Sequence, residues 1–214
     1  MPGNYLLTPL EFILTTLFSL YILLVMVRFL LQLVRADFYN PVSQFVVKLT
    51  NPALRPLRRV IPGLAGIDFA AVVLMLTLQL LSLALVLLLR GHGVPVVTLI
   101  FWALAELVSL AINIYIGAIF IQVIISWINP GSYNPVVGLL HTLTEPLLRP
   151  ARRLLPPVSG FDLSPVLVLL ALQVLKMLAA GHQFLERQAL PGGKLAPPPA
   201  HQAVVLGYFV EPDP

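Results

Sequence analysis

Between Asp68 and Arg90 the chain carries no charged side chain, and residues 69–89 are apolar apart from a few polar positions such as Gln79. A helix rises about 1.5 Å per residue, so a run of this length matches the roughly 30 Å hydrocarbon core of a bilayer. The composition agrees, because 58% of the 214 residues are hydrophobic and only 10% are charged, whereas soluble domains carry about 25% charged residues. The sequence predicts an integral membrane protein.

Three further apolar segments extend this prediction to an all-α protein with four transmembrane helices, at about residues 9–34, 69–89, 99–128 and 163–180. Arg28 and Lys176 lie near span ends, where long basic side chains can reach the interface. Glu106 is expected at the outer edge of the third span. A buried pair between Glu106 and Lys176 is the alternative, and interfacial snorkelling is the favoured interpretation.

The basic residues indicate an orientation. Arginine and lysine cluster between spans one and two and between spans three and four, whereas the link around residues 91–93 has only Arg90 before it. The positive-inside rule then places the two long connectors in the cytoplasm and the termini outside. The chain has no cysteine, which excludes disulfides and thiol chemistry. No cleaved signal peptide is expected, because no basic residue precedes the first apolar run.

The chain also repeats itself. At an offset of 94 residues, the segment YNPV at 39–42 aligns with YNPV at 133–136, and the match continues without gaps through paired Arg-Pro, Arg-Arg and Gly-x-Asp motifs to Gln79 and Gln173. Each copy holds a span, a connector and a span, so both copies have the same orientation and form a parallel repeat. The predicted domains are a first repeat at 1–94, a second at 95–185, and a Pro/Gly-rich tail at 186–214.

Each connector is expected to be an amphipathic helix at the membrane interface. Val42, Phe45, Val46 and Leu49 recur at helical spacing, with Ser43, Gln44 and Lys48 on the other side. The segments 50–52 and 144–146 each place a capping side chain before a proline, which predicts a helix break and restart. Asp68 and Asp162 precede apolar runs and are expected to cap helices, with Ser164 as an alternative cap in the second copy.

These motifs carry a resemblance. The string TEPLLRPARRLLP at 144–156, followed by GFDLSP at 160–165, resembles the signature of the YggT family, and the similarity covers about residues 8–183. The first copy departs from it, with Asn51 in place of Glu145 and Ala70-Ala71 in place of Ser164-Pro165. The resemblance implies a small bacterial inner-membrane or plastid protein. Roles associated with the family include osmotic or ion homeostasis, division-linked or nucleoid organisation, and cofactor attachment to a membrane cytochrome.

The most specific candidate site is basic. Six arginines recur at the same spacing in the two connectors and are a candidate docking surface for anionic lipid or a protein partner: Arg55, Arg58, Arg59, Arg149, Arg152 and Arg153. The alternative interpretation is that these charges only hold the connectors in the cytoplasm. Gln79 and Gln173 lie near mid-membrane and predict either interhelical hydrogen bonds or a polar constriction between the repeats.

No catalytic or metal-binding motif is present, and the four histidines lack ligand spacing. The prediction is therefore a nonenzymatic membrane protein without a cofactor or metal, which organises or assists a membrane complex through its basic connectors. Its expected partners are anionic lipid headgroups and either a membrane protein or further copies of itself, and nucleic acid is not expected. The alternative is a small ion channel or transporter involved in osmotic or ion homeostasis.

Overall fold

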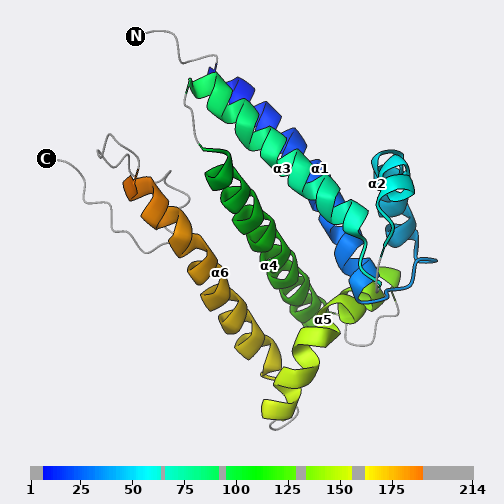
Figure 1. The fold of residues 1–214 in the computed structure, drawn as a ribbon. Helices are drawn as coiled ribbons and strands as arrows, with labels where there is room; N and C mark the ends of the chain where they lie inside the picture. The colour runs from blue at the N-terminus through cyan, green and yellow to red at the C-terminus, as the bar shows by residue number, and fades with distance from the viewer. Residues whose placement is uncertain (1–6, 64–65, 92–94, 129–133, 156–161, 190–214) are drawn as a thin grey trace, which may run out of the picture. The chain divides into compact units, whose positions relative to one another are not determined.

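A computed structural model describes residues 7–63, 66–91, 95–128, 134–155 and 162–189, and within these ranges the chain is helical and contains no strand. Six helices follow one another in the described ranges (Figure 1): α1 (Leu7–Leu33), α2 (Pro41–Val60), α3 (Phe69–Arg90), α4 (Val96–Ile128), α5 (Pro135–Leu154) and α6 (Ser164–Ala189). The all-α prediction is confirmed. The chain divides into two units between Ala179 and Ala180, and the contacts below all belong to the first.

Three helices are long and apolar enough to cross a membrane: Thr8–Leu33, Phe69–Leu89 and Val96–Ile128. They coincide with three of the four predicted spans. The fourth is not confirmed, because the apolar segment of α6 found in the described residues is the shorter Ser164–Ala179. Of the predicted tail, residues 186–189 continue α6 rather than start a linker, and residues 190–214 lie outside the described ranges.

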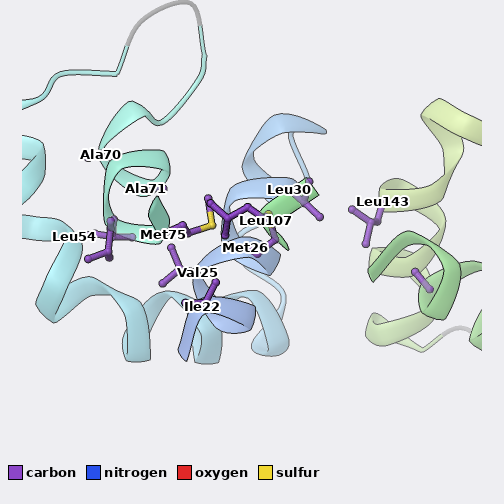
Figure 2. Packing of buried hydrophobic residues seen from close by; sticks show 12 residues of the cluster. Ile22, Val25, Met26, Leu30, Leu54, Ala70, Ala71, Met75, Leu107 and Leu143 are labelled. Carbon is purple, nitrogen blue, oxygen red and sulfur yellow. The ribbon is translucent and has the colours of Figure 1, made fainter. Parts of the chain in front are cut away.

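The main core joins α1 to α3 and extends to their neighbours. Figure 2 shows Ile22, Val25 and Met26 of α1 packed with Met75 of α3 and Leu54 of α2. The small residues Ala70 and Ala71 at the start of α3 are fully buried, which allows the helix backbones to approach closely. Leu107 of α4 and Leu143 of α5 complete this cluster, so it is not confined to the first predicted repeat.

A second cluster holds α6 against the preceding helices. Val168 and Leu172 of α6 pack with Ile112 and Ile119 of α4 and with Leu148 of α5. Each predicted repeat therefore has a core that joins its two long helices to its connector.

Both connectors are single continuous helices, so the predicted breaks are wrong. Helix α2 runs through Pro52 and Pro56, and α5 runs through Pro146 and Pro150. A proline removes one intrahelical hydrogen bond, but a buried face continues past it on both helices. In α2 that face consists of Ser43, Val46, Thr50 and Leu54. Packing along the whole face compensates for the lost bonds.

The predicted apolar face of α2 is only partly the face that packs on the protein. Val46 is buried, whereas Val42, Phe45 and Leu49 are exposed. Ser43, on the other side, is buried and its hydroxyl donates to the Asp37 carbonyl at 3.0 Å. The residues that contact the rest of the protein thus include small polar side chains. The exposed apolar side chains of α2 form a separate surface.

The starts of the connectors are built alike and touch each other. Asn40 and Asn134 each cap their helix by accepting a hydrogen bond of 2.9 Å from the backbone N–H two residues later, and a proline occupies the first helical position in both. The Asn40 amide also donates to the Pro135 carbonyl at 2.7 Å. This bond joins two segments that are equivalent in the predicted repeat.

Candidate functional site

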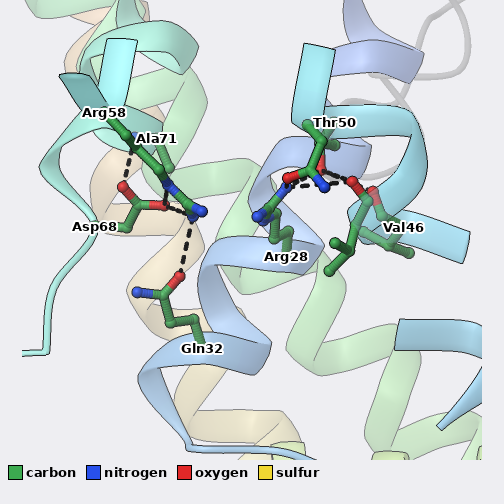
Figure 3. A network of polar contacts seen from close by, with 9 residues as sticks. Arg28, Gln32, Val46, Thr50, Arg58, Asp68 and Ala71 are labelled. Atoms are coloured by element: carbon green, nitrogen blue, oxygen red, sulfur yellow. Dashed lines mark hydrogen bonds and ion pairs between the residues drawn. The ribbon is translucent and has the colours of Figure 1, made fainter. Parts of the chain in front are cut away.

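A polar junction connects α1 to α2 around Arg28. This arginine is only 5% exposed, and its Nη1 donates to the Thr50 hydroxyl at 2.7 Å and to Asn51 Oδ1 at 2.9 Å. Figure 3 shows its guanidinium pointing at Thr50. The sequence-based interpretation of Arg28 as a snorkelling residue is wrong, because hydroxyl and amide groups of the connector meet the guanidinium inside the protein.

The Thr50 hydroxyl can accept a hydrogen bond from Arg28 because its own proton is donated to another group. Its hydroxyl donates to the Val46 carbonyl at 2.7 Å, one turn earlier in α2. The lone pairs of the oxygen then face Arg28. A hydrogen bond to a charged group is stronger than one between neutral groups, so the fully buried Thr50 is a firm attachment point for α1.

The same junction contains an ion pair between Arg58 and Asp68. Arg58 donates to Asp68 Oδ2 through both Nε, at 3.2 Å, and Nη2, and it also reaches Gln32 Oε1 at 3.4 Å (Figure 3). Asp68 precedes α3 and accepts from the Ala71 N–H at 3.3 Å. One carboxylate therefore caps α3 and links it to α2.

The second junction occupies the corresponding place between α4 and α5. Gln122, 94 residues after Arg28, lies 2.6 Å from the Thr144 hydroxyl and 2.9 Å from His141 Nδ1. Thr144, 94 residues after Thr50, is also fully buried and bonds to the Leu140 carbonyl one turn earlier, at 2.8 Å. A neutral amide thus replaces the guanidinium, and the direction of the bond is reversed, because Gln122 Oε1 accepts from the Thr144 hydroxyl whereas Arg28 donates to Thr50.

Arg152 forms the ion pair of the second junction. Its Nε donates to Asp162 Oδ2 and its Nη1 to Glu145 Oε2, both at 3.0 Å. Partial burial acts to raise the pKa of Asp162, but hydrogen bonds from Ser164 and Arg152 outweigh it and hold this pKa below its ordinary value. Asp162 accepts from the Ser164 backbone N–H at 2.9 Å.

The two junctions carry opposite charge. In the first, Arg28 and Arg58 are accompanied by the single carboxylate of Asp68, while Asn51 is neutral. In the second, Arg152 alone meets the two carboxylates of Glu145 and Asp162. The excess is one positive charge in the first junction and one negative charge in the second.

A cavity of about 500 Å³ opens beside the first junction. Three basic side chains and three amide side chains line it, together with Phe38 and Val47: Arg28, Lys48, Arg58, Gln32, Gln44 and Asn51. None of its lining residues is acidic.

The six predicted docking arginines fall into two groups. Arg55, Arg59, Arg149 and Arg153 are exposed and make no ion pair within the described residues. Arg58 and Arg152 are half-buried and hold Asp68 and Asp162.

The residues predicted to make intramembrane contacts do not bond to one another. Gln79 and Gln173 are both half-buried, and neither side-chain amide forms a hydrogen bond in the ranges given above. Glu106 is exposed and Lys176 is half-buried, and the described part of the chain contains no ion pair between them.

Sequence reasoning missed Arg28 and the two buried threonines as site residues. The repeat alignment contained the signal, because it superposes Arg28 on Gln122 and Thr50 on Thr144. A polar residue that recurs near the end of a span, together with a threonine repeated in the connector, is typical of a hydrogen bond buried between membrane helices.

Comparisons with known proteins agree with the architecture. The family model described as CCB3/YggT matches the chain twice, at residues 7–89 and 101–183. An uncharacterised protein of Pseudomonas aeruginosa is 50% identical over 169 residues, which cover 78% of this chain and 86% of the relative. The uncharacterised YggT protein of Escherichia coli K12 is 39% identical over 170 residues, covering 78% of this chain and 87% of the relative.

A plant relative is matched over a shorter stretch. The chloroplastic YlmG homolog protein 2 of Arabidopsis thaliana is 36% identical over 61 residues, which cover 28% of this chain and 24% of the relative. No solved structure matches the chain. With the family model covering most of its length in two matches, the chain belongs to the CCB3/YggT family.

Proposed function

We propose that this protein is a nonenzymatic integral membrane protein that organises or assists a membrane complex, and that it docks its partner through α2 and α5. The observation that carries the proposal is the exposed arginine surface, which we define as Arg55, Arg59, Arg149 and Arg153. Arg58 and Arg152 are excluded from it because they hold carboxylates of the protein itself.

The spacing of these residues suits a docking surface. Arg55 and Arg59 are four residues apart on α2, as are Arg149 and Arg153 on α5, so each pair shares one face of its helix. An exposed arginine retains its five donors for carboxylates or phosphates. The partner is therefore an acidic surface of a membrane protein, or of a second copy of this chain, approached at the level of the headgroups.

We infer the membrane arrangement from the same features. Helix α6 is the fourth span, and the two repeats lie parallel in the inner membrane of a bacterium with both connectors in the cytoplasm. Three observations support this arrangement: the family model matches twice, the polar contacts recur at an offset of 94 residues, and α6 packs on α4 and α5 through Val168 and Leu172.

The use of the carboxylates in the two junctions supports the nonenzymatic part of the proposal. Asp68, Asp162 and Glu145 accept hydrogen bonds from arginines of the same junction. These carboxylates cap helices or hold the connectors. Because each is bound to an arginine of the protein itself, it is not positioned to act on a substrate as a general acid or base.

Crosslinking from the connectors tests the proposal. Because the chain has no cysteine, a single cysteine introduced as Val60→Cys or Leu154→Cys carries a photoactivatable thiol reagent at one known place. Both positions are strongly exposed and lie at equivalent helix ends. In native membranes we expect one discrete adduct from each position. Changing all four residues of the exposed arginine surface to glutamate should abolish both adducts.

The matched control changes the same four arginines to lysine, which preserves the charge and should preserve the adducts. Thiol accessibility of the Val60→Cys variants from each side of the membrane verifies that insertion and orientation are unchanged. An adduct that persists undiminished in the glutamate variant with correct insertion contradicts docking through these arginines. An adduct of twice the chain mass identifies the partner as a second copy.

A further inference from the structure

We propose that the cavity beside Arg28 is a binding site for an anionic phosphate group, carried by a lipid headgroup or present as a free phosphate. It lies among α1, α2 and the segment that joins them, and three cations and three amides line it without a carboxylate. Its volume of about 500 Å³ is within the range of small-ligand pockets, about 300–1,000 Å³.

Arg28 places a buried charge at the wall of the cavity. It lines the cavity, is only 5% exposed, and its Nη1 is bonded to neutral groups, the Thr50 hydroxyl and Asn51 Oδ1. A charge with little access to water is costly unless an opposite charge lies near it. A phosphate in the cavity supplies that opposite charge.

The local charge balance favours the same ligand. Arg28 has Arg58 and Asp68 as its charged neighbours, so one carboxylate accompanies two guanidinium groups. Lys48 adds a third cation at the exposed side of the cavity. An entering anion neutralises this excess, whereas a cation would be repelled. The amides of Gln32, Gln44 and Asn51 supply uncharged donors for further oxygens.

The site belongs to the first repeat alone. At the positions of Arg28, Lys48 and Asn51 the second repeat has Gln122, Thr142 and Glu145, so two cations are replaced by neutral groups and a carboxylate is added. The paired copies therefore predict one phosphate per chain. They also supply the least disruptive substitution at the buried position, because glutamine already occupies it in Gln122.

This inference does not depend on the exposed arginine surface, since Arg55, Arg59, Arg149 and Arg153 do not line the cavity. The two proposals can therefore be tested separately. The glutamate substitutions of the crosslinking test leave the cavity lining unchanged, and the substitutions in the cavity leave the exposed arginine surface unchanged.

The experiment uses the full-length purified chain and two variants of the cavity. Native mass spectrometry measures retention of phosphatidylglycerol against phosphatidylcholine, and a second arm measures binding of radiolabelled inorganic phosphate in detergent without lipid. We expect one tightly retained phosphatidylglycerol or one bound phosphate per chain. Arg28→Gln and Lys48→Gln should each weaken binding about tenfold, as expected for the loss of one charge-assisted contact.

Arg35→Gln is the matched control, because it removes one exposed charge close to α2 that belongs neither to the cavity lining nor to the exposed arginine surface, and it should leave binding unchanged within about twofold. If Arg28→Gln does not fold, as judged from its melting curve, Lys48→Gln decides, since Lys48 is exposed. Lipid binding that excess inorganic phosphate does not displace identifies a headgroup, and binding of inorganic phosphate alone identifies a free anion. Equal weakening by Arg35→Gln, no weakening by Lys48→Gln, or no binding in either arm overturns the proposal.

Discussion

Arg28 and Gln122 stand 94 residues apart, and each forms a hydrogen bond with a fully buried threonine of the connector that follows, at 2.7 Å to Thr50 and 2.6 Å to Thr144. The two pairs occupy equivalent positions, but Thr50 accepts from a charged guanidinium whereas Thr144 donates to a neutral amide oxygen. This difference separates the two halves of the protein both in stability and in the ligands they can attract.

The two threonines should differ in what they contribute to stability. Thr50→Val removes an acceptor from a buried cation and should lower the free energy of unfolding by about 1.5–3 kcal/mol, whereas Thr144→Val breaks a neutral bond and should cost about 0.5–1.5 kcal/mol. Melting curves of the purified variants in one detergent measure the order. Thr142→Val, on the exposed face of α5, is the control and should change little. A larger loss for Thr144→Val would contradict the assigned roles.

The two capping aspartates provide a second matched pair. The Asp68 side chain is 4% exposed and that of Asp162 is 37% exposed. Asp68→Asn should therefore destabilise the chain by about 1.5–3 kcal/mol, because it removes a buried charge-assisted contact that also caps α3. Asp162→Asn should cost less than about 1 kcal/mol, as is usual for exposed ion pairs. The comparison uses the same melting assay, and equal losses would argue against the burial-based explanation.

The pH dependence of stability should carry a contribution from Asp162. Its folded-state pKa lies below the ordinary value of 3.8, so its contribution to stability is complete above that value and is lost as the pH falls through the lowered pKa. The difference in melting temperature between the natural chain and Asp162→Asn should be present at about pH 6 and vanish in strong acid. A difference that stays constant through acid would show that Asp162 acts without its charge.

Arg35 should be replaceable by glycine with a gain in stability. It ends α1 with a φ of 54°, and the Arg35 and Ala36 N–H groups close the helix on Gln32 and Leu31. Left-handed backbone costs roughly 1 kcal/mol for a residue with a Cβ. Arg35→Gly should therefore raise the unfolding free energy by about 1 kcal/mol, as read from melting curves. Arg35→Ala, which removes the charge but keeps the Cβ, should show no such gain.

The failures of sequence reasoning concentrate in the connectors. Pro52 and Pro146 predict helix breaks because proline lacks an N–H, but α2 and α5 continue through them. Local propensity was outweighed by packing along one uninterrupted face, which no short window of sequence contains. Ser43 was grouped with Gln44 and Lys48 on the polar side of the helix, although it alone of the three is buried, where its hydroxyl bonds to the Asp37 carbonyl.

The candidate site was predicted only in part. The repeated arginines were evident from their spacing. That Arg58 and Arg152 form ion pairs while their neighbours stay exposed became evident only from the positions of Asp68 and Asp162 in the structure. Arg28 was interpreted from its place near a span end, where a basic side chain can reach water. Its actual partners, Thr50 and Asn51, are more than twenty residues away in the chain.

The sequence by itself determined the helical class, the positions of three long apolar helices and membership of the family, because these depend on local composition, periodicity and motif spacing. Only the tertiary structure decided which polar residues face each other across helices. The contacts of Arg28, Arg58, Gln122 and Arg152 depend on how the connectors pack against the long helices, and hydrophobic patterns specify a buried face without specifying its polar partners. The same packing produced a basic cavity in one repeat and an ion pair network with one excess negative charge in the other.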